Sequence, residues 1–433
     1  MADALAVRDP SGVEARAYRR VTLRLIPFLF LCYVVAYLDR VNVGFAKLQM
    51  LKDLGMSETA YGLGAGIFFL GYFLFEVPSN LILHRTGARV WIARIMITWG
   101  VLSAATMFVT SAGWFYLVRF LLGIAEAGFF PGIILYLTQW YPASRRARIV
   151  ALFMTAVAMS GVIGGPVSGW ILETMAGVNG WAGWQWLFLL EGLPSLAMGV
   201  AVYFYLDDSV EQAVWLPADE REVLMANLRN DVGGTEHGSV FATLRDPHVL
   251  LLASVYFCIV MGLYGIGFWL PQLIRTMGVE DAGRIGLLSA IPYAVAAFVM
   301  VLVGRSSDLR GERRWHLAGG ALAGALGLVV AGLFSTTLAI GLPAMTVATV
   351  GVLASAPVFW ALPTASLRGA SAAAGIAVIN SIGNLAGFLS PYLIGVARDV
   401  TGEATVGLYA IAVCLLVGAC LAFPATARRD LTP

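Results

Sequence analysis

About twelve apolar runs, each roughly 20 residues long, constrain the fold of this chain more than any other feature. A helix of that length crosses the hydrocarbon core of a bilayer, and it satisfies its own backbone hydrogen bonds, which lipid cannot do. We therefore predict an all-α membrane protein with twelve transmembrane helices, at residues 21–45, 57–80, 89–110, 112–138, 147–171, 182–206, 248–274, 282–304, 315–334, 338–361, 370–394 and 403–424.

The composition agrees with a chain that lies in a lipid bilayer. Of its 433 residues, 59% are hydrophobic and 12% are charged, with a mean hydropathy of +0.80, which is too apolar for a typical soluble domain. The formal net charge of +2 is small, and we expect no nucleic-acid partner. The cysteines lie within apolar runs, so we expect neither a disulfide framework nor a metal site; they are Cys32, Cys258, Cys414 and Cys420.

One long polar segment, 207–247, separates six apolar runs from six. We predict a six-helix bundle over residues 1–206, a linker loop at 207–247 and a second six-helix bundle over 248–433. Most of the 28 Lys and Arg residues fall in the N-terminal segment, the linker and the alternate loops on the same side. The positive-inside rule then places both termini and the linker in the cytoplasm, in a bacterial-type inner membrane.

The two halves of the chain resemble each other. The segment Asn80–Arg89 follows the second apolar run, and the similar segment Gly304–Arg314 follows the eighth. Two copies of a six-helix unit, joined by a cytoplasmic loop, are typical of transporters whose halves rock about a central site. Because one chain already contains both halves, a monomer is sufficient for this plan.

An acid and a base lie side by side within the first apolar run. Charges in such a run are costly and mark functional sites by default. Tyr33, Tyr37 and Arg40 have the spacing of one helix face. Asp39 is turned by about 100° from Arg40, so it either lines the same cavity or faces a neighbouring helix.

Two further groups of polar residues lie inside first-half runs. Arg119 and Glu126 are seven residues apart and share a helix face, as do Tyr72 and Glu76 at a spacing of four. Each charged pair could also be a buried ion pair that only orients helices, and each aromatic residue could serve ordinary packing.

The second half places no Asp, Glu, Lys or Arg well inside its apolar runs. We therefore expect the first half to bind an anion and to handle protons, while the second half supplies neutral contacts. The candidates for those contacts are Trp360 and the pair Asn380 and Asn384, which share a helix face.

A carboxylate substrate needs a fixed cation, and arginine binds a carboxylate through two parallel hydrogen bonds. Arg40 is our candidate for that role. A proton-coupled carrier also needs an acid that takes up a proton when water is excluded. We expect Asp39 and Glu126 to be such acids, with Arg119 and Glu76 close to them.

The loop after the eighth run resembles the signature loop of the major facilitator superfamily. The first-half copy, which includes Arg85 and Arg89, has His84 where the family usually has Asp. The resemblance implies that these loops take part in gating. The second-half residues that carry it are Gly304, Asp308, Gly311, Arg313 and Arg314.

Three further motifs resemble the anion:cation symporter branch of that superfamily: Tyr37-Leu-Asp39-Arg40-Val-Asn42, Phe75-Glu76-Val-Pro78-Ser-Asn80 and the stretch from Arg119 to Gly132. The resemblance implies a rocker-switch importer of a small hydroxy, sugar-acid or aromatic carboxylate, with protons as the coupling ion and no other cofactor. It assigns the substrate arginine to Arg40, proton uptake to Asp39 and Glu126, and substrate contacts to Tyr37, Tyr72, Trp360 and Asn384.

The same sequence features are also compatible with other functions. An organic-anion exchanger or exporter would have the same sequence features, and so would a nutrient sensor that does not transport. The chain has neither His-Glu-x-x-His nor Gly-x-Ser-x-Gly, and its intramembrane acids lie beside arginines. We therefore predict that it is not an enzyme.

Overall fold

The computed structural model describes residues 10–231, 245–367 and 370–427, and every regular element within these ranges is a helix. The all-α prediction is therefore confirmed. The first half contains α1 (Pro10–Val41), α2 (Val43–Asp53), α3 (Glu58–Thr86), α4 (Ala88–Ala105), α5 (Ala112–Glu126), α6 (Phe129–Thr138), α7 (Ala143–Met154), α8 (Ala156–Thr174) and α9 (Gly183–Tyr205). The remainder contains α10 (Ala218–Asp231), α12 (Pro247–Thr276), α13 (Ala282–Arg310), α14 (Arg314–Leu333), α15 (Leu338–Ser366), α16 (Ala370–Thr401) and α17 (Thr405–Ala427).

Twelve helical segments within the described ranges are long and apolar enough to span a membrane, which is the predicted number. Most of them begin and end within a few residues of the expected positions. The largest differences are a first segment that extends over Gly12–Asp53 and an eleventh that covers Gly375–Thr401. The first is longer because α1 starts well before the apolar run and α2 continues it after a break at Asn42.

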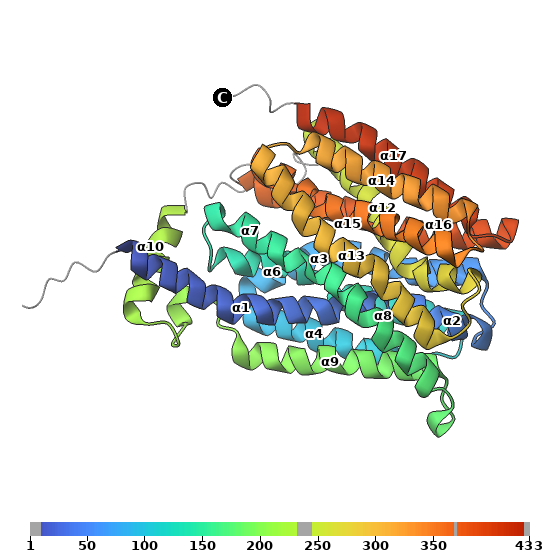
Figure 1. The fold of residues 1–433 in the computed structure, drawn as a ribbon. Coiled ribbons are helices and arrows are strands. Elements are labelled where there is room, and N and C mark those ends of the chain that lie inside the picture. Colours follow the sequence, from blue (N-terminus) through green and yellow to red (C-terminus); the bar gives the residue numbers. More distant parts are fainter. Residues whose placement is uncertain (1–9, 232–244, 368–369, 428–433) are drawn as a thin grey trace, which may run out of the picture.

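The two halves of the chain form two groups of helices that lie side by side (Figure 1). The first-half helices occupy the lower part of the view and α12 to α17 the upper part. The start of α1 and all of α10 lie at one end, and α2 lies at the other, which we call the α2 end. The junctions at 53–58, 276–282 and 401–405 also belong to the α2 end.

The halves are in close contact where α3 packs on α16 and where α8 packs on α13. Glycine permits the approach. A Cβ on Gly165 of α8 would lie 2.5 Å from the backbone oxygen of Gly286 on α13. Gly62 of α3 faces the backbone of Pro391 on α16 equally closely. Since these residues lie toward the α2 end, the two halves are closed against each other at that end.

A left-handed glycine positions one of the candidate acids. Gly128 has a φ of +85°, a conformation that glycine adopts without steric cost, and it separates α5 from α6. Glu126 is therefore the last residue of α5. The break lies in the middle of the fourth apolar run, so the carboxylate is held within the helix bundle and not at a loop.

Part of the linker packs on the first half. Glu220 of α10 lies 3.0 Å from the Arg20 side chain on α1. The Arg24 guanidinium lies 4.5 Å from the Tyr205 ring and 4.7 Å from the Trp215 ring, so it is held between two aromatic faces. The described part of the linker thus packs on α1. The predicted division at 206 and 248 stays a prediction.

Candidate functional site

Arg40 is the centre of the candidate site. It lies near the end of α1, is 5% exposed, and donates from Nε to Oε1 of Glu126 over 3.0 Å. Its Nη2 also binds that oxygen, while Nη1 donates to the Tyr264 hydroxyl over 2.8 Å. Tyr264 belongs to α12, so this one guanidinium connects the two halves of the protein.

Aromatic rings surround the Arg40 guanidinium. Its central carbon lies 5.8 Å from the ring centroid of Tyr37, 5.5 Å from that of Phe68 and 5.4 Å from that of Tyr72. The negative faces of such rings attract a cation, and they exclude water from it. The charge on Arg40 is therefore stabilised in a dry environment, where an anion that reaches it binds strongly.

Arg119 does not pair with Glu126 in this conformation. Its side chain is 0% exposed and lies on α5, where Nη2 donates to the backbone oxygen of Ala65 over 3.3 Å. Its Nε and Nη1 make no hydrogen bond within the described residues. The possibility of an Arg119–Glu126 ion pair, which their spacing allowed, is thus replaced by the Arg40–Glu126 pair.

Asp39 faces away from Arg40, into the interior of the first half. Its carboxylate accepts hydrogen bonds from Trp99 Nε1 over 2.8 Å, from Ser103 Oγ over 2.7 Å and from Ser195 Oγ. These donors belong to α4 and α9. Of the two orientations that the sequence left open, the structure has Asp39 facing neighbouring helices.

Glu76 contacts the other half of the protein. Its Oε1 accepts a hydrogen bond from Asn380 Nδ2 over 2.6 Å, and its Oε2 accepts one from Ser381 Oγ over 2.7 Å. The acid lies on α3 and both donors lie on α16. Glu76 is therefore a hydrogen-bonded link between the halves at the wall of the central cavity.

The cavity between the halves brings together most of the predicted substrate contacts. It encloses about 660 Å³ that protein atoms do not fill, including its open part. Six of the seven predicted residues line it: Tyr33, Tyr37, Arg40, Tyr72, Asn380 and Asn384. Trp360 does not line it, because its ring packs beside the cavity against Tyr256, at 5.0 Å, and Phe130, at 6.4 Å.

Several lining residues were not predicted. Tyr256 and Tyr264 of α12 and Phe130 of α6 all line this cavity. A hydroxyl in the middle of an apolar run was the available signal for the two tyrosines. No such signal exists for Phe130, whose surroundings depend on the turn at Gly128.

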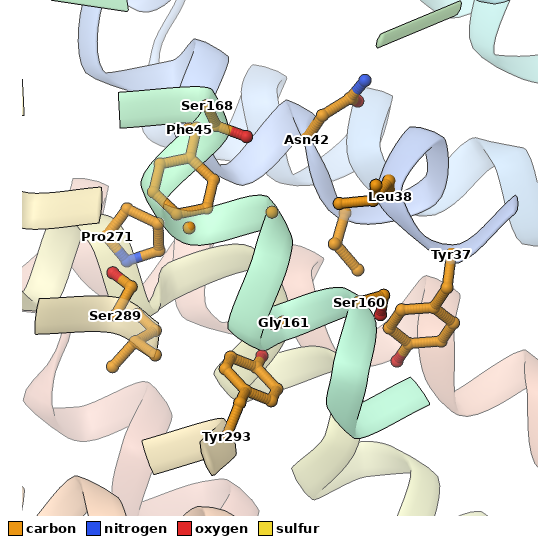
Figure 2. Close-up of a pocket in the computed structure, with 15 residues that line it drawn as sticks. Tyr37, Leu38, Asn42, Phe45, Ser160, Gly161, Ser168, Pro271, Ser289 and Tyr293 are labelled. Carbon is orange, nitrogen blue, oxygen red and sulfur yellow. The ribbon is translucent and has the colours of Figure 1, made fainter. Parts of the chain in front are cut away.

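A smaller cavity lies next to the main one (Figure 2). Tyr37 lines both, and Tyr293 from the second half faces Gly161 of α8. Ser168 lines this cavity and donates to Oε1 of the buried Glu191 over 2.6 Å. The polar groups of the first half therefore continue from the main cavity toward the α2 end.

The predicted gating residues make contacts within their own halves. Arg313 lies 2.5 Å from Asp308 and donates to Ser307 Oγ over 2.8 Å. Gly311 closes α13 at a φ of +61°, and Arg314 donates to Thr426 Oγ1 over 3.1 Å. Gly304 is half-buried on α13.

In the first-half loop, His84 stands where the family usually has an aspartate, and a different acid, Asp208, contacts the loop. Asp208, which follows α9, accepts a hydrogen bond from the backbone N–H of Arg89 over 2.8 Å, and its other oxygen lies 4.0 Å from Arg89 Nε. Arg85 and His84 are exposed. The partner of Arg89 therefore comes from the segment that leads into the linker.

Comparison with known proteins agrees with this architecture. A model of the Major Facilitator Superfamily matches residues 29–391. A putative tartrate transporter of Agrobacterium vitis is 52% identical over 95% of this chain and 91% of its own length. The putative metabolite transport protein NicT of Pseudomonas putida is 49% identical over 95% of this chain and 94% of its own length.

A solved structure with the same fold is that of a bacterial homologue of the human lysosomal transporter Spinster. Its TM-score is 0.74 at 18% identity, over 93% of this chain and 96% of that one. The family model and the two relatives show that the chain is a multi-pass membrane transporter and not an enzyme. The chain belongs to the major facilitator superfamily.

Proposed function

We propose that the protein is a proton-coupled symporter that imports a small organic carboxylate. The observation that carries the proposal is the buried guanidinium of Arg40, held between Glu126 of the first half and Tyr264 of the second in a cavity that both halves line. The names of the relatives, a tartrate and a metabolite transporter, support a small organic anion as the substrate.

Competition for Arg40 would couple the substrate to the proton. A substrate carboxylate that binds Arg40 in the two-bond geometry displaces Glu126, whose charge is then buried without a partner. Proton uptake by Glu126 removes that cost. Because the coupling is reciprocal, a proton on Glu126 raises the affinity of Arg40 for the substrate, and loss of the proton releases it.

Arg119 contributes a second buried positive charge on the helix that carries Glu126. Two of its donor groups make no hydrogen bond in this conformation, and it lies two turns before Glu126 on the same helix. We propose that this charge helps Glu126 to lose its proton again after the substrate has left. The sequence analysis likewise expected Arg119 close to the coupling acids.

Asp39 would hold a second proton. Two of its three donors are serine hydroxyls, which can rotate to accept a hydrogen bond when the acid is protonated. The cluster therefore fits either state of the acid without a change in packing. Since Asp39 is adjacent to Arg40 on α1, the groups that we assign to the proton and to the substrate belong to one helix.

The transport cycle would be an alternation of access by rocking of the two halves. If both termini are cytoplasmic, as the positive-inside rule predicts, the closed α2 end would face outward. Glu76 would join the halves during the motion through Asn380 and Ser381. Protonation of Glu76 would weaken or reorganise these two hydrogen bonds. We propose that Glu76 takes part in coupling in this way.

Uptake into liposomes tests the proposal. Purified protein should accumulate a labelled carboxylate when the outside is more acidic, and Arg40→Ala should abolish this uptake. Arg94→Ala is the matched control, because Arg94 is a half-buried arginine that stacks 3.8 Å over Trp91 outside the cavity. Persistence of normal uptake in Arg40→Ala, or equal loss in the control, contradicts the proposal.

Glu126→Gln separates coupling from binding. The neutral side chain mimics the protonated acid, so we expect substrate exchange between loaded and external pools to persist while accumulation driven by the pH gradient is lost. A variant that still accumulates substrate against its gradient would show that Glu126 is not the coupling acid. Net efflux in the wild type under an inward proton gradient would instead favour an exporter.

A further inference from the structure

Glu191 is a buried acid that the transport cycle proposed above does not use. It lies on α9, within the sixth span at Gly183–Tyr205, and is 4% exposed. Its polar neighbours among the described residues are neutral hydroxyl and amide groups and one other acid, and none of them is a cation. A carboxyl group in such a place is costly, and it marks a functional site by default.

Asp39 is the acid near Glu191. The two carboxyl groups are close enough to repel each other when both are ionised. Ser195, whose hydroxyl donates to Asp39, lies four residues after Glu191 on α9, so the two side chains are neighbours on one helix face. Asp39 itself lines neither of the two cavities. A proton that reaches Asp39 must therefore pass through another side chain, and Glu191 is the acid in position to pass it.

The charged surroundings of Glu191 are simple. The helices α1, α2, α4 and α8 and the short turn at 106–108 pack on α9. Asp39 of α1 is the ionisable group among them that acts on Glu191. Asp39 in turn is within electrostatic range of Glu126 and Arg119 on α5. A change of charge at the substrate site therefore reaches Glu191 through Asp39.

Asn42 lies beside Glu191 and three residues after Asp39. It is 1% exposed, and neither its amide oxygen nor its amide nitrogen makes a hydrogen bond within the described residues. Oε2 of Glu191 makes none there either. An amide donates to a carboxylate through its nitrogen and accepts from a carboxylic acid through its oxygen. Asn42 is therefore suited to both protonation states of Glu191.

The smaller cavity leads to these groups from the α2 end. Ser168 and Asn42 line it (Figure 2), and Ser168 donates to Oε1 of Glu191 over 2.6 Å. The cavity encloses about 390 Å³, including its open part, between α8 of the first half and α12 and α13 of the second. Gly165, which packs on Gly286 where the halves close, also lines it. Separation of the halves at this contact would open the cavity and admit water to Ser168 and Asn42.

We propose that Glu191 relays protons between the smaller cavity and Asp39. Glu191 takes a proton from water in the cavity and passes it to the Ser195 hydroxyl, which gives its own proton to Asp39. Each step breaks one O–H bond and forms another, so one proton moves and Ser195 is restored. The inference rests on the proposed function, because it assumes that Asp39 takes up a proton. The proton then has a path of its own, separate from the main cavity that contains Arg40.

Infrared spectroscopy of the full chain in lipid tests the relay without a substrate. In acidic buffer, the carbonyl band that is lost in Asp39→Asn reports the protonated Asp39, and transfer to D₂O shifts this band as deuterium replaces the proton. The Glu191→Gln side chain still accepts from Ser168 but cannot pass a proton on. We therefore expect the replacement at Asp39 to be at least about tenfold slower in Glu191→Gln than in the wild type. Glu191→Asp restores an acid and should recover most of the rate.

An unchanged or faster replacement in Glu191→Gln overturns the relay, since a mere packing defect would admit water and speed the exchange. A wild type without an Asp39-dependent band in acidic buffer overturns it as well. The control is Glu211→Gln, which changes an exposed acid beyond the end of α9 and should leave the rate unchanged. Equal slowing in this control would show that the effect is not specific to Glu191.

Transport measurements separate the relay from the proposed function. The ligand is whichever of labelled tartrate, gluconate and benzoate wild-type liposomes take up fastest. Glu191→Gln should still exchange it between internal and external pools, while accumulation driven by the pH gradient becomes slower by about fivefold or more. Accumulation at the wild-type rate overturns the relay and leaves the proposed function standing. If the wild type takes up none of the three acids, the proposed function fails, and the infrared result alone decides the relay.

Discussion

Asp399 holds the two halves together at the α2 end. It lies near the end of α16, and its carboxylate accepts hydrogen bonds from the backbone N–H groups of Glu58, over 3.1 Å, and Thr59, over 2.8 Å. These groups form the first turn of α3, so an acid of the second half caps a helix of the first. Arg398 adds an ion pair of 3.1 Å to the Glu58 side chain. The cap exists only while this end is closed.

The magnitude of the cap follows from this geometry. Loss of a helix cap costs about 0.5–2 kcal/mol. Here Ser57 continues to cap α3 through its bond from the Ala60 N–H, over 3.1 Å, and Asp399 is exposed to solvent. We therefore expect Asp399→Ala to destabilise the closed conformation by about 1 kcal/mol, which corresponds to about a fivefold shift in population.

A distance distribution measures that shift. Spin labels at Lys52→Cys and Thr336→Cys, both exposed and on opposite halves at the α2 end, report whether this end is open. In a background without native cysteines, Asp399→Ala should increase the long-distance fraction about fivefold while that fraction is still small.

The matched control for this measurement is Glu403→Ala. Glu403 lies four residues further along and bonds the Thr405 hydroxyl of its own half, over 3.1 Å. Its hydrogen bonds among the described residues all stay within the second half, so its loss should leave the distribution unchanged. An unchanged distribution in Asp399→Ala, or the same shift in Glu403→Ala, would refute the reasoning.

Two other substitutions have expected outcomes that can be measured. Gly286→Ala places a methyl group against the backbone oxygen of Gly165, so the same spin labels should report a more open α2 end; a narrower distribution would contradict this packing. Asp208→Ala removes the hydrogen bond from the Arg89 N–H at 2.8 Å, and the loss of about 1 kcal/mol should lower the apparent melting temperature. Glu211→Ala changes an exposed acid and should leave the melting temperature unchanged. An equal fall in melting temperature in both variants would exclude a specific role for Asp208.

The predicted spans agree with the structure because they depend on local properties. The length and apolar character of a run decide whether it crosses a bilayer, and no tertiary contact is needed. The charge at Arg40 was visible for the same reason, as an exception within an apolar run. Helical spacing also predicts that Tyr33, Tyr37 and Arg40 share one helix face, and all three line the same cavity.

The partners of the charged groups could not be read from spacing along a helix. Arg119 and Glu126 share α5, yet Glu126 bonds Arg40 of α1, a contact between helices that are distant in sequence. Tyr264 was missed because a tyrosine in an apolar run is also typical of ordinary packing. Its contact with Arg40 depends on how α12 of the second half packs on the first half, mainly on α2.

The sequence by itself indicated that this chain crosses the membrane about twelve times, that its intramembrane charged groups belong to the first half, and that Arg40 is the candidate for binding a carboxylate. These properties follow from hydropathy, charge and helical period. Only the tertiary structure decided that Arg40 bonds Glu126 and Tyr264, that Asp39 faces away from it, and that the halves close at the α2 end. The reason is physical: each of these contacts joins helices that are distant in sequence, and their relative position is set by packing of both halves.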